Sequence, residues 1–297
     1  EVVTTGIKSS LKDAIEIKRK NVGVVDAITA EDIGKFPDGN LAEALSRMVG
    51  VTTTRSNDEG VAITVRGLGP NFNLVTLNGR TMPTAPPQWG GGRSFNFGDI
   101  SSHGVAAVEV YKSSNATLPS GGIGATVNMV TIKPLKRENG GAISVKGVAH
   151  SKNAVGDDIT PEIDFVFSRK GSYNGGDWGF ALSGAHHEMN NREEGTNEIT
   201  WLPSPLENHL NPNAVVTSAN TRADNAFFYP AALMYQVRDN ERTRDNLQTT
   251  FQYEIGRFTT TFDYTSSSLE FNSYGFQTGS GFAGWDATRA SIDSNGA

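Results

Sequence analysis

Histidine is the residue type in this chain best suited to catalysis or metal binding, but its spacing predicts neither. His186 and His187 are adjacent in a predicted strand, so their side chains point to opposite faces and cannot share one metal ion. The other three histidines are far apart in sequence: His103, His150 and His209. Cysteine is absent, which excludes zinc–thiolate sites and disulfides. We therefore predict no metal site and no cofactor.

Known nucleotide-binding and hydrolase motifs are also missing. Gly122-Ile123-Gly124 precedes a predicted strand rather than a helix, unlike a dinucleotide-binding loop. The glycines at 90–92 lack the Lys-Ser pair of a phosphate-binding loop, and no Gly-x-Ser-x-Gly turn is present. The carboxylates form no recognisable pair. The sequence therefore predicts no catalytic residues and a protein that is not an enzyme.

Aromatic and amide side chains are better candidates, for ligand binding. Trp89 lies in a segment rich in proline and glycine, 83–97, and Trp201 lies in a long connection between predicted strands. Aromatic faces pack against sugar rings, and amide groups hydrogen-bond to hydroxyls. The predicted ligand-binding residues are Asn71, Asn73, Gln88, Trp89, Arg93 and Trp201. In the alternative interpretation, the aromatic residues pack within their own loops or lie at a membrane interface.

The first half of the chain must position most of these residues, and residues 22–137 are predicted to form a compact domain with α-helix and β-strand. Asn40–Val49 is the clearest helix, with Asn40 as N-cap, Glu43 three residues later and Gly50 after its end. Four residues form its apolar stripe: Leu41, Ala44, Leu45 and Met48. Short strands are expected at Val61–Arg66, Leu74–Leu77, Val105–Ser113 and Ala125–Pro134, the first two in one small sheet. Asn78-Gly79 predicts a tight turn.

Residues 138–297 show a different pattern, with apolar and polar residues alternating along five predicted strands. The strands are "AISVKGVAH", "EIDFVFSR", "WGFALSGAHH", "LQTTFQYEI" and "RFTTTFDYTS". Such alternation is typical of transmembrane barrel strands, and also of a sandwich with one solvated face. The connections are 151–161, 170–177, about 190–245 and Gly256, so long and short ones alternate. This alternation favours an outer-membrane barrel, in which short turns and long loops lie at opposite ends.

Composition narrows the class of partner. The net charge is −6, whereas nucleic-acid binding requires a basic face, so we expect no nucleic-acid partner. No run of about 18 apolar residues predicts a transmembrane helix. Residues 1–21 read as a polar leader, which is either a short surface helix or a solvated tether.

Three segments resemble the plug domain of TonB-dependent outer-membrane receptors. They are "AEDIGKFPDGNLAEALSRMVGV", "VAITVRGLGPNFNLVTLNGR" and "VAAVEVYKSSNATLPSGGIGATVNMVTIKP", in the family's order, within residues 22–134. The resemblance implies an α+β plug followed by the first antiparallel strands of a barrel of roughly 22 strands. Five strands cannot close such a barrel, so we expect this chain to be the N-terminal part of a longer protein.

The resemblance also implies a location, partners and roles. It implies a protein of the bacterial outer membrane, in contact with lipid, with its plug and N-terminus facing the periplasm. Residues Glu1, Val2, Val3, Thr4, Thr5 and Gly6 look like a TonB box, which would bind the energy-transducing protein TonB. Arg66 and Arg80 are expected to meet carboxylates of the barrel wall, such as Glu162, Asp164 or Asp263.

The expected function is energy-driven import of a scarce nutrient. The run "DAITAEDIGKFPDGNLAEALSR" resembles a receptor subgroup linked to oligosaccharide uptake, so an oligosaccharide is the favoured ligand. The alternatives are a ferric siderophore, cobalamin, or a passive structural or adhesive protein that has kept a plug.

Overall fold

The computed structural model describes residues 12, 14–29, 40–56, 59–84, 92–149, 159–197, 201–205, 215–218, 226–230, 232–281 and 289–292. Two compact units divide the chain. One contains residues Glu1–His150, Asp157–Met189 and Arg242–Phe271, and the other contains Ser151–Gly156, Asn190–Glu241 and Asn272–Ala297. Within the part of the chain that the structure describes, no helix has the length and apolar character needed to cross a membrane.

A five-stranded mixed sheet is the centre of the α/β region, residues 14–137. Its order is β1 (Val25–Thr29), β6 (Val105–Tyr111), β7 (Ala125–Thr131), β4 (Asn73–Leu77) and β5 (Arg80–Thr81). The β4–β7 pair is parallel and the other pairs are antiparallel. Asn78 and Gly79 both have positive φ, 50° and 78°, as the turn between β4 and β5 requires. The predicted tight turn is confirmed.

One helix and a hairpin supply the other side of the core. Helix α3 (Leu41–Leu45) contacts β2 (Val51–Ser56) and β3 (Glu59–Val65), which pair antiparallel. The N-cap is confirmed, because the Asn40 side chain accepts a hydrogen bond from the Glu43 amide at 3.2 Å. The helix is shorter than predicted: it ends at Leu45, and turns lead to Gly50 with φ 73°.

The hydrophobic core of the first unit belongs to the α/β region. Leu41 and Leu45 of α3, Val108 of β6 and Val127 of β7 are each fully buried. Phe95 and Phe97 join this core and meet edge to face, with ring centroids 5.1 Å apart. Two short 3-10 helices, Phe97–Asp99 (η2) and Ser102–Gly104 (η3), then lead into β6. Residues 14–20, in the polar leader, are helical.

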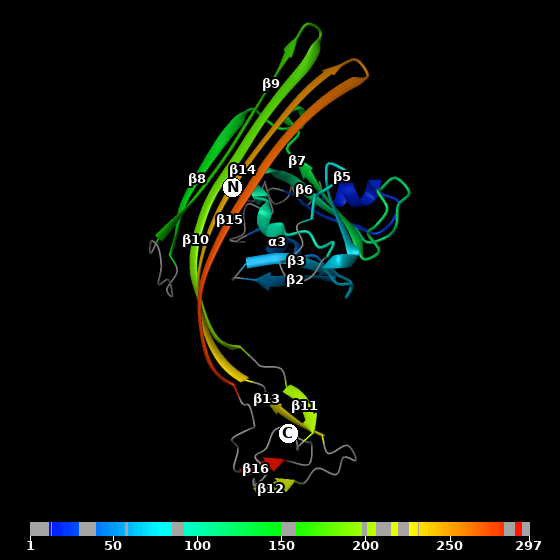
Figure 1. The fold of residues 1–297 in the computed structure, drawn as a ribbon. Helices are drawn as coiled ribbons and strands as arrows, with labels where there is room; N and C mark the ends of the chain where they lie inside the picture. The colour runs from blue at the N-terminus through cyan, green and yellow to red at the C-terminus, as the bar shows by residue number, and fades with distance from the viewer. Residues whose placement is uncertain are drawn as a thin grey trace. The chain divides into compact units, whose positions relative to one another are not determined.

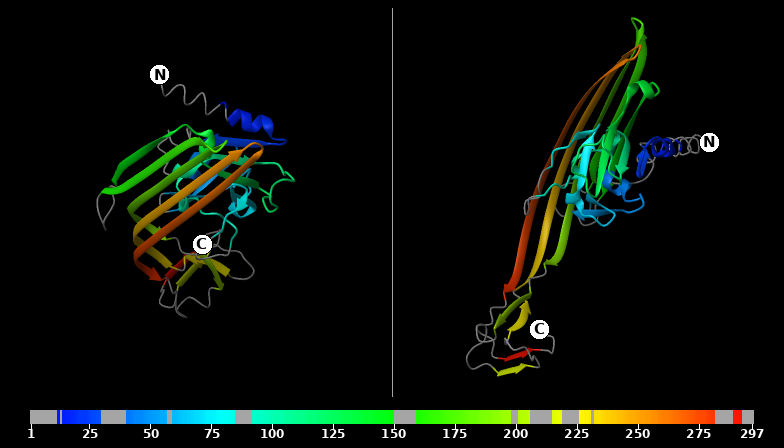
Figure 2. Two further views of the ribbon diagram at one scale, coloured as in Figure 1. Left: turned by 90° about the horizontal axis from the view of Figure 1, so that it is seen from above. Right: turned by 90° about the vertical axis from the view of Figure 1, so that its right-hand side faces the viewer.

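The long strands form a second five-stranded sheet, in the order β15-β14-β10-β9-β8. Their bounds are β8 Gly140–Ala149, β9 Ile159–Tyr173, β10 Gly176–Asn197, β14 Ala232–Ile255 and β15 Phe258–Gly281. Figures 1 and 2 show these strands side by side, with the α/β region against one face of the sheet. Short turns at 174–175 and 256–257 join β9 to β10 and β14 to β15.

The second unit, considered alone, contains short strands in the connection between β10 and β14 and after β15. β11 (Trp201–Pro205) pairs antiparallel with β13 (Ala226–Pro230), and β12 (Val215–Ser218) pairs parallel with β16 (Arg289–Ile292). The Arg192 guanidinium holds the Asp239 carboxylate through two hydrogen bonds of 2.7 and 3.0 Å.

Two sequence predictions about elements were wrong. Val61–Arg66 and Leu74–Leu77 do not share a sheet, because β3 pairs with β2 while β4 pairs with β7 and β5. The connection predicted at about 190–245 is shorter, since β10 continues to Asn197 and β14 begins at Ala232. The two differences have separate causes. Local patterns predict a strand but not its partner, and the polar ends of the long strands resemble a loop in sequence.

Candidate functional site: the contact between the α/β region and the long strands

The long strands bury polar side chains and expose apolar ones. On the parts of the long strands that belong to the first unit, the buried polar residues are Thr160, Asp164, Ser168, Ser183, His187, Arg244, Thr250 and Gln252. The large apolar residues exposed there include Ile143, Val145, Ile163, Phe167, Leu247, Phe251, Ile255, Phe258, Phe262 and Tyr264. The two sets alternate, so one face of the sheet is apolar and the other polar. This arrangement suits lipid outside and a polar domain inside.

An ion-pair cluster at Glu59 is the most buried of the polar contacts. Glu59 begins β3, and its Oε1 accepts a hydrogen bond from Arg244 Nη2 at 2.6 Å. The other carboxylate oxygen accepts from Arg242 Nη1. Arg244 and Glu59 are 1% and 5% exposed, so the pair is screened little by water. Removing either partner would leave an uncompensated buried charge.

Asp99 supplies a second carboxyl group close to this cluster. Burial raises the pKa of Asp99, and the positive charge of Arg244 opposes that shift. The Asp99 carbonyl oxygen also accepts hydrogen bonds from Asn246 Nδ2, at 3.1 Å, and from Ser267 Oγ. Two arginines of β14 therefore face two carboxyl groups of the α/β region.

Asp263 of β15 forms a second polar contact between the α/β region and the long strands. Its carboxylate accepts hydrogen bonds from Lys133 Nζ at 3.2 Å, Asn78 Nδ2 at 3.2 Å and Thr131 Oγ1 at 3.2 Å. Thr250 Oγ1 of β14 adds a fourth at 2.8 Å. The end of β7 and the turn after β4 are thereby tied to two long strands. These contacts are polar throughout, so they can separate without exposing apolar surface to water.

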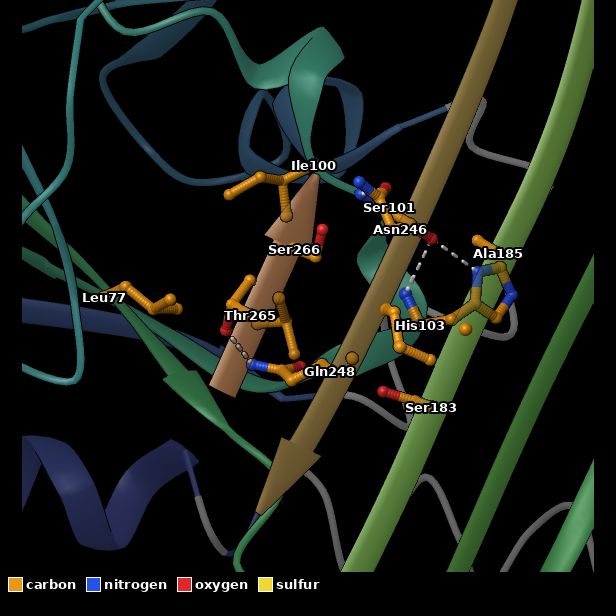
Figure 3. A pocket seen from close by; sticks show the side chains of 14 residues that line it. Leu77, Ile100, Ser101, His103, Ser183, Ala185, Asn246, Gln248, Thr265 and Ser266 are labelled. Carbon is orange, nitrogen blue, oxygen red and sulfur yellow. Dashed lines mark hydrogen bonds between the residues drawn. The ribbon is translucent and has the colours of Figure 1, made fainter. Parts of the chain in front are cut away.

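A third contact brings two histidines to one aspartate. Asp164 Oδ1 of β9 lies 3.0 Å from His103 Nδ1 of η3 and 2.7 Å from His187 Nε2 of β10. Ser101 Oγ lies 3.2 Å from His103 Nδ1, and Figure 3 shows this contact beside a cavity of about 30 Å³. Asn246 Oδ1 accepts a hydrogen bond from the Ser101 amide at 2.6 Å. His103 is far from the other histidines in sequence, and its interpretation as isolated was wrong.

The expectation for the two plug arginines is corrected. Arg66 Nη2 donates instead to the carbonyl oxygen of Gly124, at 2.8 Å, within the α/β region. Arg80 lies in β5 and is exposed. Among the described residues, neither arginine pairs with the predicted carboxylates: Lys146 pairs with Glu162, the histidines with Asp164 and Lys133 with Asp263. The left-handed backbone of Arg66, φ 53°, places it in a turn after β3, where Gly124 is the nearby acceptor.

The predicted ligand-binding residues divide into four groups. Asn71 and Arg93 are exposed and adjacent, because the Arg93 amide donates to Asn71 Oδ1 at 3.0 Å. Asn73 is 4% exposed and its Nδ2 donates to the Ile63 carbonyl at 2.8 Å, so its predicted ligand role is corrected to a structural one. Trp201 begins β11, where its backbone pairs with Pro230. Gln88, Trp89 and Glu1–Gly6 lie outside the described residues.

Sequence reasoning missed Glu59, Arg242, Arg244 and the role of His103. A signal for the arginines was present, since Arg242 and Arg244 are two residues apart and so share one face of a strand. It was overlooked because the segment was read as part of a loop. No sequence signal connects Glu59 to Arg242 and Arg244, which lie 183 and 185 positions later in the chain.

Comparison with known proteins identifies the α/β region. Residues 17–126 match the family described as TonB-dependent Receptor Plug Domain. No curated protein matches the chain.

Solved structures give further matches. The siderophore receptor PirA from Pseudomonas aeruginosa is 20% identical, with TM-score 0.41, over 87% of this chain and 45% of that one. A mutant of the ferric enterobactin receptor PfeA from the same organism is 18% identical, with TM-score 0.45, over 88% of this chain and 41% of that one. The unliganded ferric citrate transporter FecA is 14% identical, with TM-score 0.44, over 89% of this chain and 50% of that one. The chain thus spans half or less of these receptors' length.

The α/β region is therefore a plug domain, followed in the chain by long antiparallel strands. The plug match places the protein in the bacterial outer membrane, with the plug facing the periplasm.

Proposed function

We propose that this chain is part of a TonB-dependent receptor that binds a scarce nutrient at the cell surface and imports it with energy from TonB. The observation that carries the proposal is the plug itself, residues 17–126, held by buried ion pairs against the polar face of strands whose other face is apolar. A transport route through the strands requires the plug to shift or open. Polar contacts that can exchange for water permit such movement better than an apolar interface would.

TonB is the proposed energy-transducing partner, and Glu1–Gly6 is its proposed binding segment. Val2, Val3, Thr4 and Thr5 form a β-branched run, which favours an extended peptide that adds to a sheet edge of TonB. Deletion of residues 1–6 should abolish uptake and leave ligand binding at the cell surface intact. Uptake at the wild-type rate in cells carrying the deletion would contradict this assignment.

For the ligand we propose an oligosaccharide, with Trp89, Gln88, Asn71, Arg93 and Trp201 as contact residues. The support is chemical: Asn71 and Arg93 are exposed neighbours, joined through the Arg93 backbone amide, and a side-chain amide and a guanidinium can each donate hydrogen bonds to hydroxyl groups. Trp89 lies four residues before Arg93 and can add a stacking face, worth about 1 kcal/mol.

Direct binding measurements on the full-length receptor test the ligand class. Oligosaccharides, ferric siderophores and cobalamin are compared by isothermal titration calorimetry, with Trp89→Ala and Asn71→Ala as variants. Oligosaccharide binding that weakens several-fold in both variants supports the proposal. Binding of ferric siderophore or cobalamin alone would replace the ligand class but keep the receptor function. Surface binding without any TonB-dependent uptake would favour a passive structural or adhesive protein.

A further inference from the structure

We propose that His103, Asp164 and His187 form a binding site for one divalent transition-metal ion of the Zn²⁺ type. The site would join the plug to the long strands, because His103 belongs to η3 whereas Asp164 and His187 belong to β9 and β10. It is independent of the transported ligand and of the proposed transport function.

The donor atoms already converge. One atom from each residue, two imidazole nitrogens and a carboxylate oxygen, lies within 4.8 Å of the other two. The nitrogen–oxygen distances are 2.7 and 3.0 Å. In a tetrahedral zinc site with bonds of about 2.0–2.1 Å, neighbouring ligand atoms lie about 3.3 Å apart. The two nitrogen–oxygen pairs therefore need to separate by about 0.3–0.6 Å to accept an ion.

The chemistry of the three donors also fits. Two histidines with one carboxylate are a common ligand set for zinc and other first-row divalent ions, with a further position left for water. The cavity of about 30 Å³ that His103 and Ser101 line is large enough for one water molecule. Ser101 Oγ, 3.2 Å from His103 Nδ1, is close enough to hydrogen-bond to such a water.

An unpartnered atom points to a missing ligand. Both histidines contact the same oxygen of Asp164, Oδ1, and the other oxygen, Oδ2, is buried without a hydrogen-bond partner in the structure. Asp164 is only 1% exposed, so this oxygen cannot turn to bulk water. Leaving a buried carboxylate oxygen unpaired costs free energy, which a coordinated cation would remove.

The surrounding charges permit a cation. Arg244 acts electrostatically on Asp164, but it also donates a hydrogen bond to Glu59 at 2.6 Å, so Asp164 does not carry its charge alone. The carboxyl groups of Glu162 and Asp99 also act electrostatically on Arg244, which offsets part of its positive charge.

His186 provides an internal control, because it is adjacent in sequence but unsuited to a single ion. Its Nδ1 contacts Asp245 and its Nε2 contacts Glu188, so its two carboxylate partners lie on different edges of the ring. It is also more exposed than His187, with side-chain exposures of 39% and 9%.

The test uses the full-length receptor, purified in detergent from outer membranes and treated with EDTA. Isothermal titration calorimetry with ZnCl₂ is performed on the wild type and on His103→Ala, Asp164→Asn, His187→Ala and His186→Ala. We expect one Zn²⁺ per receptor in the wild type and in His186→Ala. The other three variants should bind at least tenfold more weakly. Addition of Co²⁺ to the wild type should give the absorption spectrum of a nitrogen- and oxygen-ligated cobalt site.

A second measurement separates loss of the site from loss of folding. Saturating Zn²⁺ should raise the denaturation midpoint of the wild type and of His186→Ala but not that of His103→Ala, since a ligand that binds only the folded state stabilises it. His103 lies in the plug, so its substitution leaves the strands intact and decides the question if Asp164→Asn does not fold. Zn²⁺ affinity in His103→Ala within twofold of the wild type, or no stoichiometric Zn²⁺ binding by the wild type, would overturn the proposal.

Discussion

The plug and the long strands bury opposite kinds of side chain. In the plug, Val108, Val127 and Leu45 have no exposed surface and form an ordinary apolar core. In the long strands, Arg244 and Asp164 are each 1% exposed, whereas Phe258 and Phe262 are 78% and 62% exposed. The plug is organised as a water-soluble domain is, with apolar residues inside. The strands are organised for lipid on one face and a polar partner on the other.

This difference shows how one chain can hold two domains together without merging them. Had the inner face of the strands been apolar, plug and strands would share one core and the plug could not move independently. Because that face is polar, the plug is stable through its own core and is fastened to the strands by separable hydrogen bonds and ion pairs. Four substitutions test this division.

The largest effect is expected for Glu59→Gln. It leaves Arg242 and Arg244 without their shared carboxylate, and breaking a buried ion pair costs about 3–5 kcal/mol. Hydrogen exchange at the β3 amides should report this loss as faster opening, while amides in the centre of β7 change little. The matched control is Glu43→Gln, whose partner Arg55 is 67% exposed, with an expected cost below about 1 kcal/mol. Equal effects of the two substitutions would show that Glu59 does not fasten the plug.

Leu45→Ala should break the other side of the comparison. It removes a fully buried side chain of α3 from the plug core, at a cost of about 2–5 kcal/mol. Hydrogen exchange should become faster throughout β6 and β7. The hydrogen bonds of Asp263 should not prevent this loss of protection. Val49→Ala is the control, because Val49 is 86% exposed and its truncation should change the opening free energy little. A similar response in the two variants would mean that the plug does not depend on its own core.

Phe262→Arg tests the apolar face of β15. A charge on a lipid-facing position costs up to about 2–4 kcal/mol, depending on its depth, so the yield of folded receptor in phospholipid vesicles should fall. Thr261→Arg is the control on the same strand, since Thr261 Oγ1 accepts a hydrogen bond from the inward-facing Gln252. If Thr261→Arg folds as poorly as Phe262→Arg, the two faces of the strand have been misassigned.

Lys112→Met should have the smallest effect and sharpens the comparison through its pH dependence. Burial alone raises the pKa of Asp26, but hydrogen bonds from Lys112 and Lys18 outweigh it and hold that pKa below its usual value. The stability gained is therefore present above the unfolded-state pKa of about 4 and is lost as pH falls toward the lower folded-state value. Lys112→Met should cost the plug about 1–2 kcal/mol at pH 7, measured by hydrogen exchange of β1 and β6.

In Lys112→Met, the plug should also lose less stability than the wild type when the pH falls below about 4. Lys18→Met, at a side chain 48% exposed, is the control and should change both quantities less. An unaltered acid profile in Lys112→Met would contradict the role given to this pair.

The sequence alone determined the features that arise from local backbone chemistry. Asn40 caps α3, Asn78-Gly79 turns between β4 and β5, and the period-two alternation assigns Phe262 and Asp263 to opposite faces. Each depends on residues within a few positions of one another, where the allowed dihedral angles and the strand period limit the outcome. The order of the three plug segments was also recognisable from the sequence, and the family match over residues 17–126 confirms that resemblance.

Only the tertiary structure decided which distant groups meet. Glu59 reaches Arg244 across 185 positions, His103 and His187 reach the same aspartate, and Arg66 turns to Gly124 rather than to a carboxylate. Polar side chains of one charge have many possible partners in a sequence, and nothing local ranks them. Strand order and burial make the selection, because a buried charge is stable only beside the partner that the fold brings to it.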